Sequence, residues 1–405
     1  MSEVLYLDTA RLGRMSPGAR RAVHAFTDLV GEEGGSLYCD RFLRHGLSAC
    51  PPSYREQYPG LAGWGGVGGL KAVLRELAGT PAGLPVLLAH RSAELMRLAA
   101  RLLFHPCRNV LVTDLGWPGY HDILTDVAHR AGRRVTVVAL RDRVLGGAAD
   151  SASVVAEVRR TYAAARCDGL FLPAVSNLGV RLPVAAMVEA AEAANEVRFV
   201  VVDGAQDFCH AGSDLGGGTC DLYLAGCHKW LEAYHPLGLA FYGRRRSAGV
   251  IETTLAHLVA AGEIDDPLLR FVPHLEVGRA DPPLETVAVL PLIACGGAVE
   301  GRTGADQSAG LGHRLRNLVA AGERLRPTGW TPLLPDPAFR SGILLVRAER
   351  TAVRGKAADP LRAAFQEAGV ALTAYSGGYV RLSMPDRPWR TDELDLLVGA
   401  FRTNA

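Results

Sequence analysis

The sequence predicts an α/β fold, with a large domain built on a mostly parallel sheet and a small C-terminal α+β domain. Three observations predict it. Between residues 110 and 242, short apolar runs alternate with segments of helical periodicity, which is the pattern of βαβ units. After Pro335 the order of strand-like and helical segments changes. The chain has 405 residues, 48% hydrophobic and 21% charged, which is enough to bury more than one core.

The strand-like runs of the large domain are short and apolar along their length. Such runs are typical of parallel strands that helices cover on both faces. We expect strands over Val110–Thr113, Val135–Ala139, Gly169–Pro173, Phe199–Asp203, Leu222–Ala225 and Leu239–Tyr242. We expect helices over Tyr120–Ala131, Ser153–Ala165 and Val184–Ala194. Ligands of such sheets bind beyond the carboxyl ends of the strands, so polar residues there are the first candidates for a site.

In the rest of the chain, the pattern of apolar residues predicts one or two long helices and then a compact α+β unit. Leu284–Leu325 has helical periodicity, with an interruption near Gly301–Gly304. We then expect strands over Gly342–Arg347, Ala371–Ala374 and Tyr379–Ser383, and helices over Asp359–Ala368 and Thr391–Phe401. We assign residues 15–290 to the large domain. Residues 1–14 and 291–405 are assigned to an N-terminal segment, a linking helix and the small domain.

Composition excludes several classes of protein. The 44 Lys+Arg residues balance 42 Asp+Glu, so the net charge of +2 gives no reason to expect nucleic acid or a membrane as partner. No apolar run approaches the ~20 residues of a membrane span, and the first residues lack a secretory pattern, which predicts a cytoplasmic protein. The 8 cysteines form no CxxC pair, so we expect no metal site.

A glycine-rich stretch, Gly63–Gly69, predicts a loop before a helix that begins near Leu70. No strand-like run precedes it. It therefore does not match the phosphate-binding fingerprint, which needs a strand before the glycines and a helix after them.

The segment Val200–Trp230 carries the strongest indication of chemistry. Asp203 closes a buried strand, Gln206 follows on the next loop, and Lys229 comes directly after another strand. A desolvated lysine is the amine best suited to form a Schiff base with a carbonyl, and a carboxylate can keep a pyridine nitrogen protonated. The alternative is a lysine that points outward from a helix start and an aspartate that caps a helix. The occurrence of both residues together in an α/β context favours a Schiff-base lysine with a partner carboxylate over this alternative.

Several motifs, in order along the chain, resemble the class V aminotransferase family, which includes cysteine desulfurases, isopenicillin N epimerase-like proteins and C–S lyases. They are Tyr6–Ala10 (YLDTA), Ser176–Gly179 (SNLG), Val202–Gln206 (VDGAQ) with His228–Trp230 (HKW), and Tyr379–Ser383 (YVRLS). The resemblance extends over nearly the whole chain. It implies the PLP-dependent fold type I and pyridoxal 5′-phosphate as cofactor. It does not identify the reaction, because one fold hosts many reactions.

The resemblance implies roles for residues at the cofactor ring. Lys229 would form the Schiff base and carry the proton at Cα. Asp203 would pair with the pyridine nitrogen, and Gln206 would bond the O3′ side of the ring. Asn177 would lie near the same edge or near the substrate carboxylate.

The resemblance also implies roles toward the substrate. Ala10 would lie on the substrate-facing turn. Arg381 would clamp the substrate α-carboxylate, a task that suits its planar, bidentate guanidinium. The alternative is a surface arginine on an edge strand.

The phosphate site departs from the family pattern. The amides of Ser92 and Ala93, at a helix start, can hold a phosphate. Arg91 stands where relatives have glycine, and either adds a charge there or caps the surface. His228 is expected to be a further donor, and Gly226 replaces a serine, which removes one hydroxyl contact.

Two further positions are assigned by resemblance. Trp117 stands where relatives stack a histidine on the pyridine face; the alternative is a core tryptophan in a βα loop. Tyr120 and His121 either face the substrate or begin the next helix. Arg279 stands where relatives carry a threonine that reaches the phosphate of a neighbouring subunit, which implies a homodimer with shared active sites.

The reaction is the least determined feature. A cysteine desulfurase needs a persulfide-carrying cysteine on a mobile loop of the small domain, and the last cysteine, Cys295, falls on a predicted helix. The chain resembles most the epimerase-like branch with cysteine-conjugate C–S lyases, including enzymes of lincosamide biosynthesis. We therefore expect an amino-acid substrate, an S-substituted cysteine conjugate of antibiotic metabolism, cleaved by β-elimination. Decarboxylation coupled to oxidative deamination, transamination and epimerisation are the alternatives. Ser36–His45 and Pro51–Tyr58 either line the pocket entrance or form a dimer contact.

Overall fold

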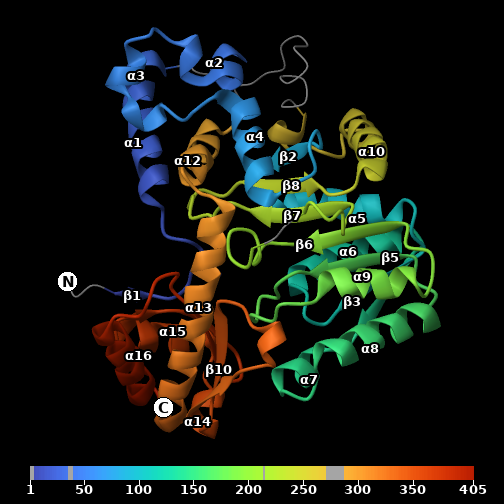
Figure 1. The fold of residues 1–405 in the computed structure, drawn as a ribbon, viewed down its shortest axis with the longest axis vertical. Coiled ribbons are helices and arrows are strands. Elements are labelled where there is room, and N and C mark those ends of the chain that lie inside the picture. Colours follow the sequence, from blue (N-terminus) through green and yellow to red (C-terminus); the bar gives the residue numbers. More distant parts are fainter. Residues whose placement is uncertain (1–3, 35–39, 213–214, 271–286) are drawn as a thin grey trace.

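A seven-stranded sheet forms the centre of the computed structural model, which describes residues 4–34, 40–212, 215–270 and 287–405 (Figure 1). The strand order is β2-β8-β7-β6-β5-β3-β4, and only β8 runs against its neighbours. The strands are β2 (Val86–Ala89), β3 (Asn109–Thr113), β4 (Arg134–Val138), β5 (Gly169–Pro173), β6 (Phe199–Asp203), β7 (Leu222–Gly226) and β8 (Gly238–Tyr242). The predicted mostly parallel sheet is confirmed, and β2 is a strand that the sequence analysis did not predict.

Side chains of alternate strand residues pack into two separate cores, one on each face of this sheet. In β5, Leu170 and Leu172 belong to one core and Phe171 to the other, as the period of two along a strand requires. The first core includes residues of α1 (Pro17–Glu33), α4 (Gly66–Ala78), α8 (Ser151–Ala164), α9 (Val184–Glu192) and α12 (Val289–Val299). The second includes residues of α5 (Ser92–Phe104), α6 (Pro118–Arg130) and α10 (Ala248–Ala260). Shorter helices are α2 (Asp40–His45), α3 (Tyr54–Gln57) and α7 (Arg141–Leu145).

The C-terminal unit has its own core and its own sheet. Its four antiparallel strands follow the order β12-β13-β10-β9, and the N-terminal strand β1 (Leu5–Tyr6) pairs with β11 beside them. The elements are α13 (Gly304–Leu325), β9 (Trp330–Leu333), β10 (Ile343–Ala348), α14 (Thr351–Arg354), α15 (Ala358–Glu367), β11 (Val370–Ala371), β12 (Thr373–Tyr375), β13 (Tyr379–Ser383) and α16 (Thr391–Thr403). The predicted small α+β domain is confirmed.

Two local predictions were wrong. The single strand expected over Ala371–Ala374 is divided, because β11 pairs with the distant N-terminal strand β1 whereas β12 pairs with β13. The loop expected over Gly63–Gly69 is helical from Gly66 onward. Burial of Val67 and Leu70 outweighs the low helix propensity of the glycines there.

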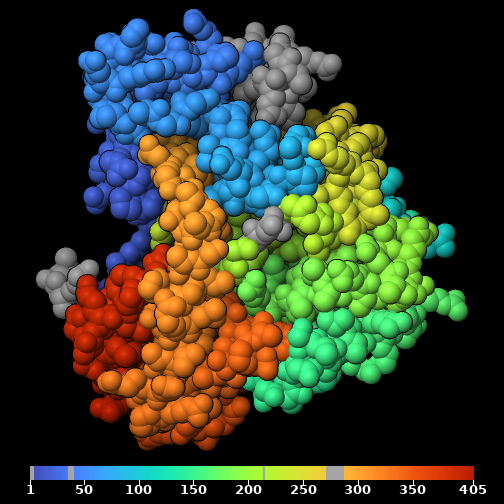
Figure 2. Space-filling view, in the orientation of Figure 1, coloured from blue at the N-terminus to red at the C-terminus, as the bar shows by residue number. Residues whose placement is uncertain are grey.

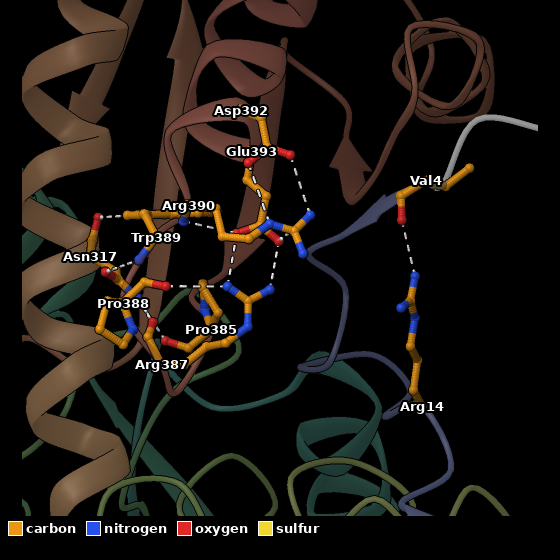
Figure 3. A network of polar contacts seen from close by, with 10 residues as sticks. All are labelled: Val4, Arg14, Asn317, Pro385, Arg387, Pro388, Trp389, Arg390, Asp392 and Glu393. Carbon is orange, nitrogen blue, oxygen red and sulfur yellow. Dashed lines mark hydrogen bonds and ion pairs between the residues drawn. The ribbon is translucent and has the colours of Figure 1, made fainter.

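Helix α13 connects the two units and lies on the surface as a long column (Figure 2). Asn317 fixes it to the segment before α16, because its side-chain amide donates to the carbonyl oxygens of Pro385 (2.9 Å) and Arg387 (2.6 Å) (Figure 3). The Trp389 indole donates to the Asn317 carbonyl at 3.1 Å. Within the described ranges, no helix is long and apolar enough to cross a membrane.

Candidate active site

The predicted reactive residues meet at the carboxyl edge of the large sheet. β6 and β7 are adjacent and parallel, so Asp203 at the end of β6 and Lys229 just after β7 come to the same side. They line a pocket of about 480 Å³, with walls from the large domain, the small domain and the N-terminal turn. Its lining residues are Ala10, Arg11, Ser92, Ala93, Trp117, Tyr120, Pro173, Val175, Asn177, Asp203, Ala205, Gln206, Lys229, Thr373, Tyr375 and Arg381.

Lys229 lies in a low-dielectric position opposite a carboxylate. Burial lowers the pKa of its ammonium to about 8, while Asp203 acts in the opposite direction. Burial also raises the pKa of the Asp203 carboxyl, opposed by the Ala205 amide, which donates to Asp203 Oδ1 at 3.0 Å, and by Lys229. The site therefore contains an amine with a substantial neutral fraction at mildly alkaline pH.

The loop after Lys229 is held in an uncommon conformation. Glu232 and Tyr234 adopt positive φ angles of 62° and 64°, in a backbone region that residues other than glycine rarely adopt. Arg302 holds this loop through the Glu232 carboxylate (2.9 Å) and the Trp230 carbonyl (3.2 Å). The backbone amide of Gly13 donates to the His228 carbonyl at 2.8 Å. The lysine is thus positioned from both sides.

Gln206 is locked by its neighbours. Its Nε2 donates to the Ala10 carbonyl at 2.6 Å, and its Oε1 accepts from the Trp230 indole at 2.8 Å. The Trp230 ring stacks on His210 with centroids 3.7 Å apart. One N–H of the Gln206 amide remains for a ligand, because an amide has two.

Arg381 is buried where β13 faces the pocket. Its guanidinium donates to the Asn177 carbonyl and to Thr373 Oγ1, each at 3.1 Å, and lies 3.6 Å from the Asp8 carboxylate. Its Nε is buried and has no hydrogen-bond partner in the part of the chain that the structure describes. This contradicts the alternative of a surface arginine on an edge strand. β13 lies between β12 and β10.

The start of α5 forms another wall of the pocket. Ser92 and Ala93 line it with first-turn amides, which in any helix lack intrahelical partners. Arg91 is the exposed residue before the helix and is not among the lining residues. His228 is also not among them, and its Nδ1 is buried without a partner. A Cβ on Gly226 would lie 3.0 Å from the His228 ring, so the ring leaves little room for the serine of relatives.

Trp117 lines the pocket just before α6 and is 47% exposed, which contradicts the alternative of a core tryptophan. Tyr120 combines both predicted alternatives, because it lies in the first turn of α6 and lines the pocket. Arg279 and part of Ser36–His45 lie outside the described residues.

Arg11, Thr373 and Tyr375 also line the pocket and were not predicted from the sequence. A signal existed for the last two, because they alternate on one strand and so share a face. No group of three or more His, Cys, Asp or Glu side chains that could hold a metal occurs within the described ranges.

The donor set fits pyridoxal phosphate. Lys229 offers an amine for its aldehyde, Asp203 a carboxylate for its ring nitrogen, and the α5 start with Ser92 offers donors for its phosphate. His228 Nδ1 is a further buried polar atom that has no hydrogen-bond partner among the described residues.

Residues 69–256 match the family model described as aminotransferase class-V. No curated protein matches the sequence. Among solved structures, the chain is similar to cysteine desulfurase CsdA from Escherichia coli, with 17% identity and TM-score 0.70 over 99% of this chain and 94% of that one. It is similar to a C-DES mutant with glycine covalently linked to the PLP cofactor (14%, 0.67, 99% and 97%). It is also similar to alanine–glyoxylate aminotransferase from Nostoc sp. (15%, 0.66, 100% and 96%). The fold is therefore PLP fold type I, and the cofactor is pyridoxal 5′-phosphate.

Proposed function

We propose that this PLP-dependent enzyme of the class V aminotransferase fold cleaves the C–S bond of an S-substituted cysteine conjugate by β-elimination. The balanced reaction converts the conjugate and water into a thiol, pyruvate and ammonium. The resemblance to cysteine-conjugate C–S lyases suggests a place in cytoplasmic, specialised metabolism such as antibiotic biosynthesis.

The observation that supports this proposal most directly is the environment of Lys229. When bound, pyridoxal phosphate withdraws electrons from the substrate Cα and so makes its substituents easier to remove. A lysine with a pKa of about 8 can accept the Cα proton at Nζ, because a substantial fraction of it is neutral at mildly alkaline pH. Asp203 would hold the ring nitrogen protonated, and Ser92 and Ala93 would hold the phosphate.

Arg381 favours proton removal over decarboxylation as the first step. Its guanidinium is positioned by Asn177, Thr373 and Asp8 and retains an unpartnered Nε. An α-carboxylate bound there would lose this charge-assisted pairing on leaving as carbon dioxide, whereas loss of the Cα proton preserves it. The described residues that line the pocket include no cysteine, so in this proposal the sulfur leaves as a free thiol.

We also propose a homodimer with shared active sites. Trp117 is 47% exposed at the pocket and Tyr234, close after Lys229, is 46% exposed. A partner subunit covering them would bury apolar area beside the site. Light scattering of the purified enzyme should give twice the chain mass. Mixed dimers of Lys229→Ala and Arg279→Ala chains should regain activity if Arg279 serves the partner's cofactor.

The reaction is tested with S-alkyl-cysteines and the purified enzyme. We expect equal amounts of thiol, pyruvate and ammonium, and none with Lys229→Ala. Carbon dioxide with an aldehyde would indicate the decarboxylating, oxidative alternative. A keto acid that retains the sulfur would indicate an aminotransferase, and loss of optical purity alone an epimerase.

A further inference from the structure

The pocket contains a second arginine, Arg11, besides the deeply buried Arg381. It lies on the turn between β1 and α1 and is exposed at the pocket wall. Within the described ranges its guanidinium has no side-chain hydrogen bond, ion pair or ring contact. Arg381, by contrast, already has a carboxylate neighbour in Asp8 at 3.6 Å.

The backbone that carries Arg11 is rigid. The Ala10 amide donates to Ser383 Oγ of the small domain at 2.9 Å, and the Ala10 carbonyl accepts from Gln206 of the large domain at 2.6 Å. The Arg11 amide donates to the Asp8 carbonyl at 2.9 Å, which closes the turn. Both domains therefore hold this turn in the pocket wall.

The charges around this turn leave Arg11 as the cation available to a ligand. Asp8 hydrogen-bonds Thr373 and pairs with Arg381, and it also interacts electrostatically with Arg11. The Asp8 carboxylate thus interacts with two guanidinium groups, and its ion pair is with Arg381. An anion entering the pocket would find donors on Arg11 that no group of the described residues occupies.

We propose that Arg11 is a specificity-determining residue that binds a second anionic group of the substrate, beyond its α-carboxylate. The preferred substrates are then amino acids whose side chain ends in a carboxylate or a similar anion, such as S-carboxyalkyl-cysteines. This inference rests on the proposed function, from which it takes the kind of substrate, an S-substituted cysteine. It depends on binding rather than on the bond that is broken.

The test compares acids with their isosteric amides. Apparent dissociation constants are measured with the holoenzyme, from the change in cofactor absorbance on adding aspartate, glutamate, asparagine or glutamine. The same is done for S-(2-carboxyethyl)-cysteine and its amide. We expect the wild-type protein to prefer the acid of each pair, by roughly tenfold for a charge-assisted hydrogen bond at a partly exposed site. This preference should shrink as salt is added.

Arg11→Gln should remove the preference by weakening binding of the acids alone, with the amides unchanged. Arg14→Gln is the matched control. Arg14 lies three residues on, is also exposed, is not among the residues that line the pocket, and donates to the Val4 carbonyl at 3.0 Å (Figure 3). The Arg14→Gln variant should bind acids as the wild type does.

Two results overturn the inference: equal responses to acid and amide in the wild type, including no response to either, or equal weakening of both by Arg11→Gln. The proposed function fails separately. If acids are preferred but no S-substituted cysteine yields thiol and pyruvate, the reaction assignment is wrong and the role of Arg11 stands. If cleavage occurs without acid preference, only the role of Arg11 is wrong.

Discussion

Gly13→Ala should displace the reactive lysine without altering any side chain that lines the pocket. A Cβ on Gly13 would lie 2.0 Å from the Lys229 carbonyl oxygen, whereas real Cβ contacts essentially never fall below 3.0 Å. The N-terminal segment and the lysine loop must therefore separate by about 1 Å. Displacements of that size at a reacting group cost roughly a hundredfold in rate, and overpacking costs about 1–3 kcal/mol of stability.

The assay measures the rate at which the apoprotein attaches pyridoxal phosphate covalently, together with the midpoint of urea unfolding. Gly68→Ala in α4 is the control, because, apart from its own helix turn, no atom of the described residues lies within 4 Å of the added methyl group. It should leave the attachment rate unchanged and stabilise the helix by about 0.5–1 kcal/mol. If Gly13→Ala attaches the cofactor at the wild-type rate, the contact between Gly13 and the lysine loop does not position Lys229.

Four further outcomes are expected. The attachment rate of the apoprotein should rise with pH through about 8 rather than through the ordinary lysine value of 10.5, since the neutral amine reacts. Between those values Lys229 holds more protons in the unfolded chain than in the folded one, so this lysine contributes a gain in stability as pH rises across that window; the difference between pH series of unfolding midpoints for the wild-type apoprotein and Lys229→Ala checks this. Arg381→Lys should raise the apparent dissociation constant for amino acids by roughly tenfold or more, because an ammonium cannot reproduce the forked contacts to Asn177 and Thr373; absorbance titration measures it. Arg302→Gln should cost about 1 kcal/mol in urea unfolding, because the Glu232 carboxylate loses its charged partner, and unchanged stability would contradict that pairing.

The path of the chain through the central sheet could be predicted because its signal is local. Runs such as Gly169–Pro173 and Phe199–Asp203 are apolar throughout, and both are buried strands at those bounds. Asp203 and Lys229 could be paired for the same reason. Residues that follow neighbouring parallel strands emerge at one edge of the sheet, whatever the details of packing.

Other features depend on contacts between distant segments and carry little local signal. Periodicity over Ala371–Ala374 cannot show that the chain changes partner there, because β1 lies more than 360 residues earlier. The helix at Gly66 forms against its own propensity, since burial of its apolar face is a tertiary effect.

The sequence alone therefore determined the fold class, the cofactor expected from the family resemblance, and the lysine–aspartate pair. These follow from local patterns of polarity and from motifs. The tertiary structure alone decided that Arg11 and Tyr375 share the pocket with Lys229, and that Gly13 lies against the lysine loop. Those placements arise where the N-terminal turn passes between two domains, and contacts of such long range appear only when the whole chain packs.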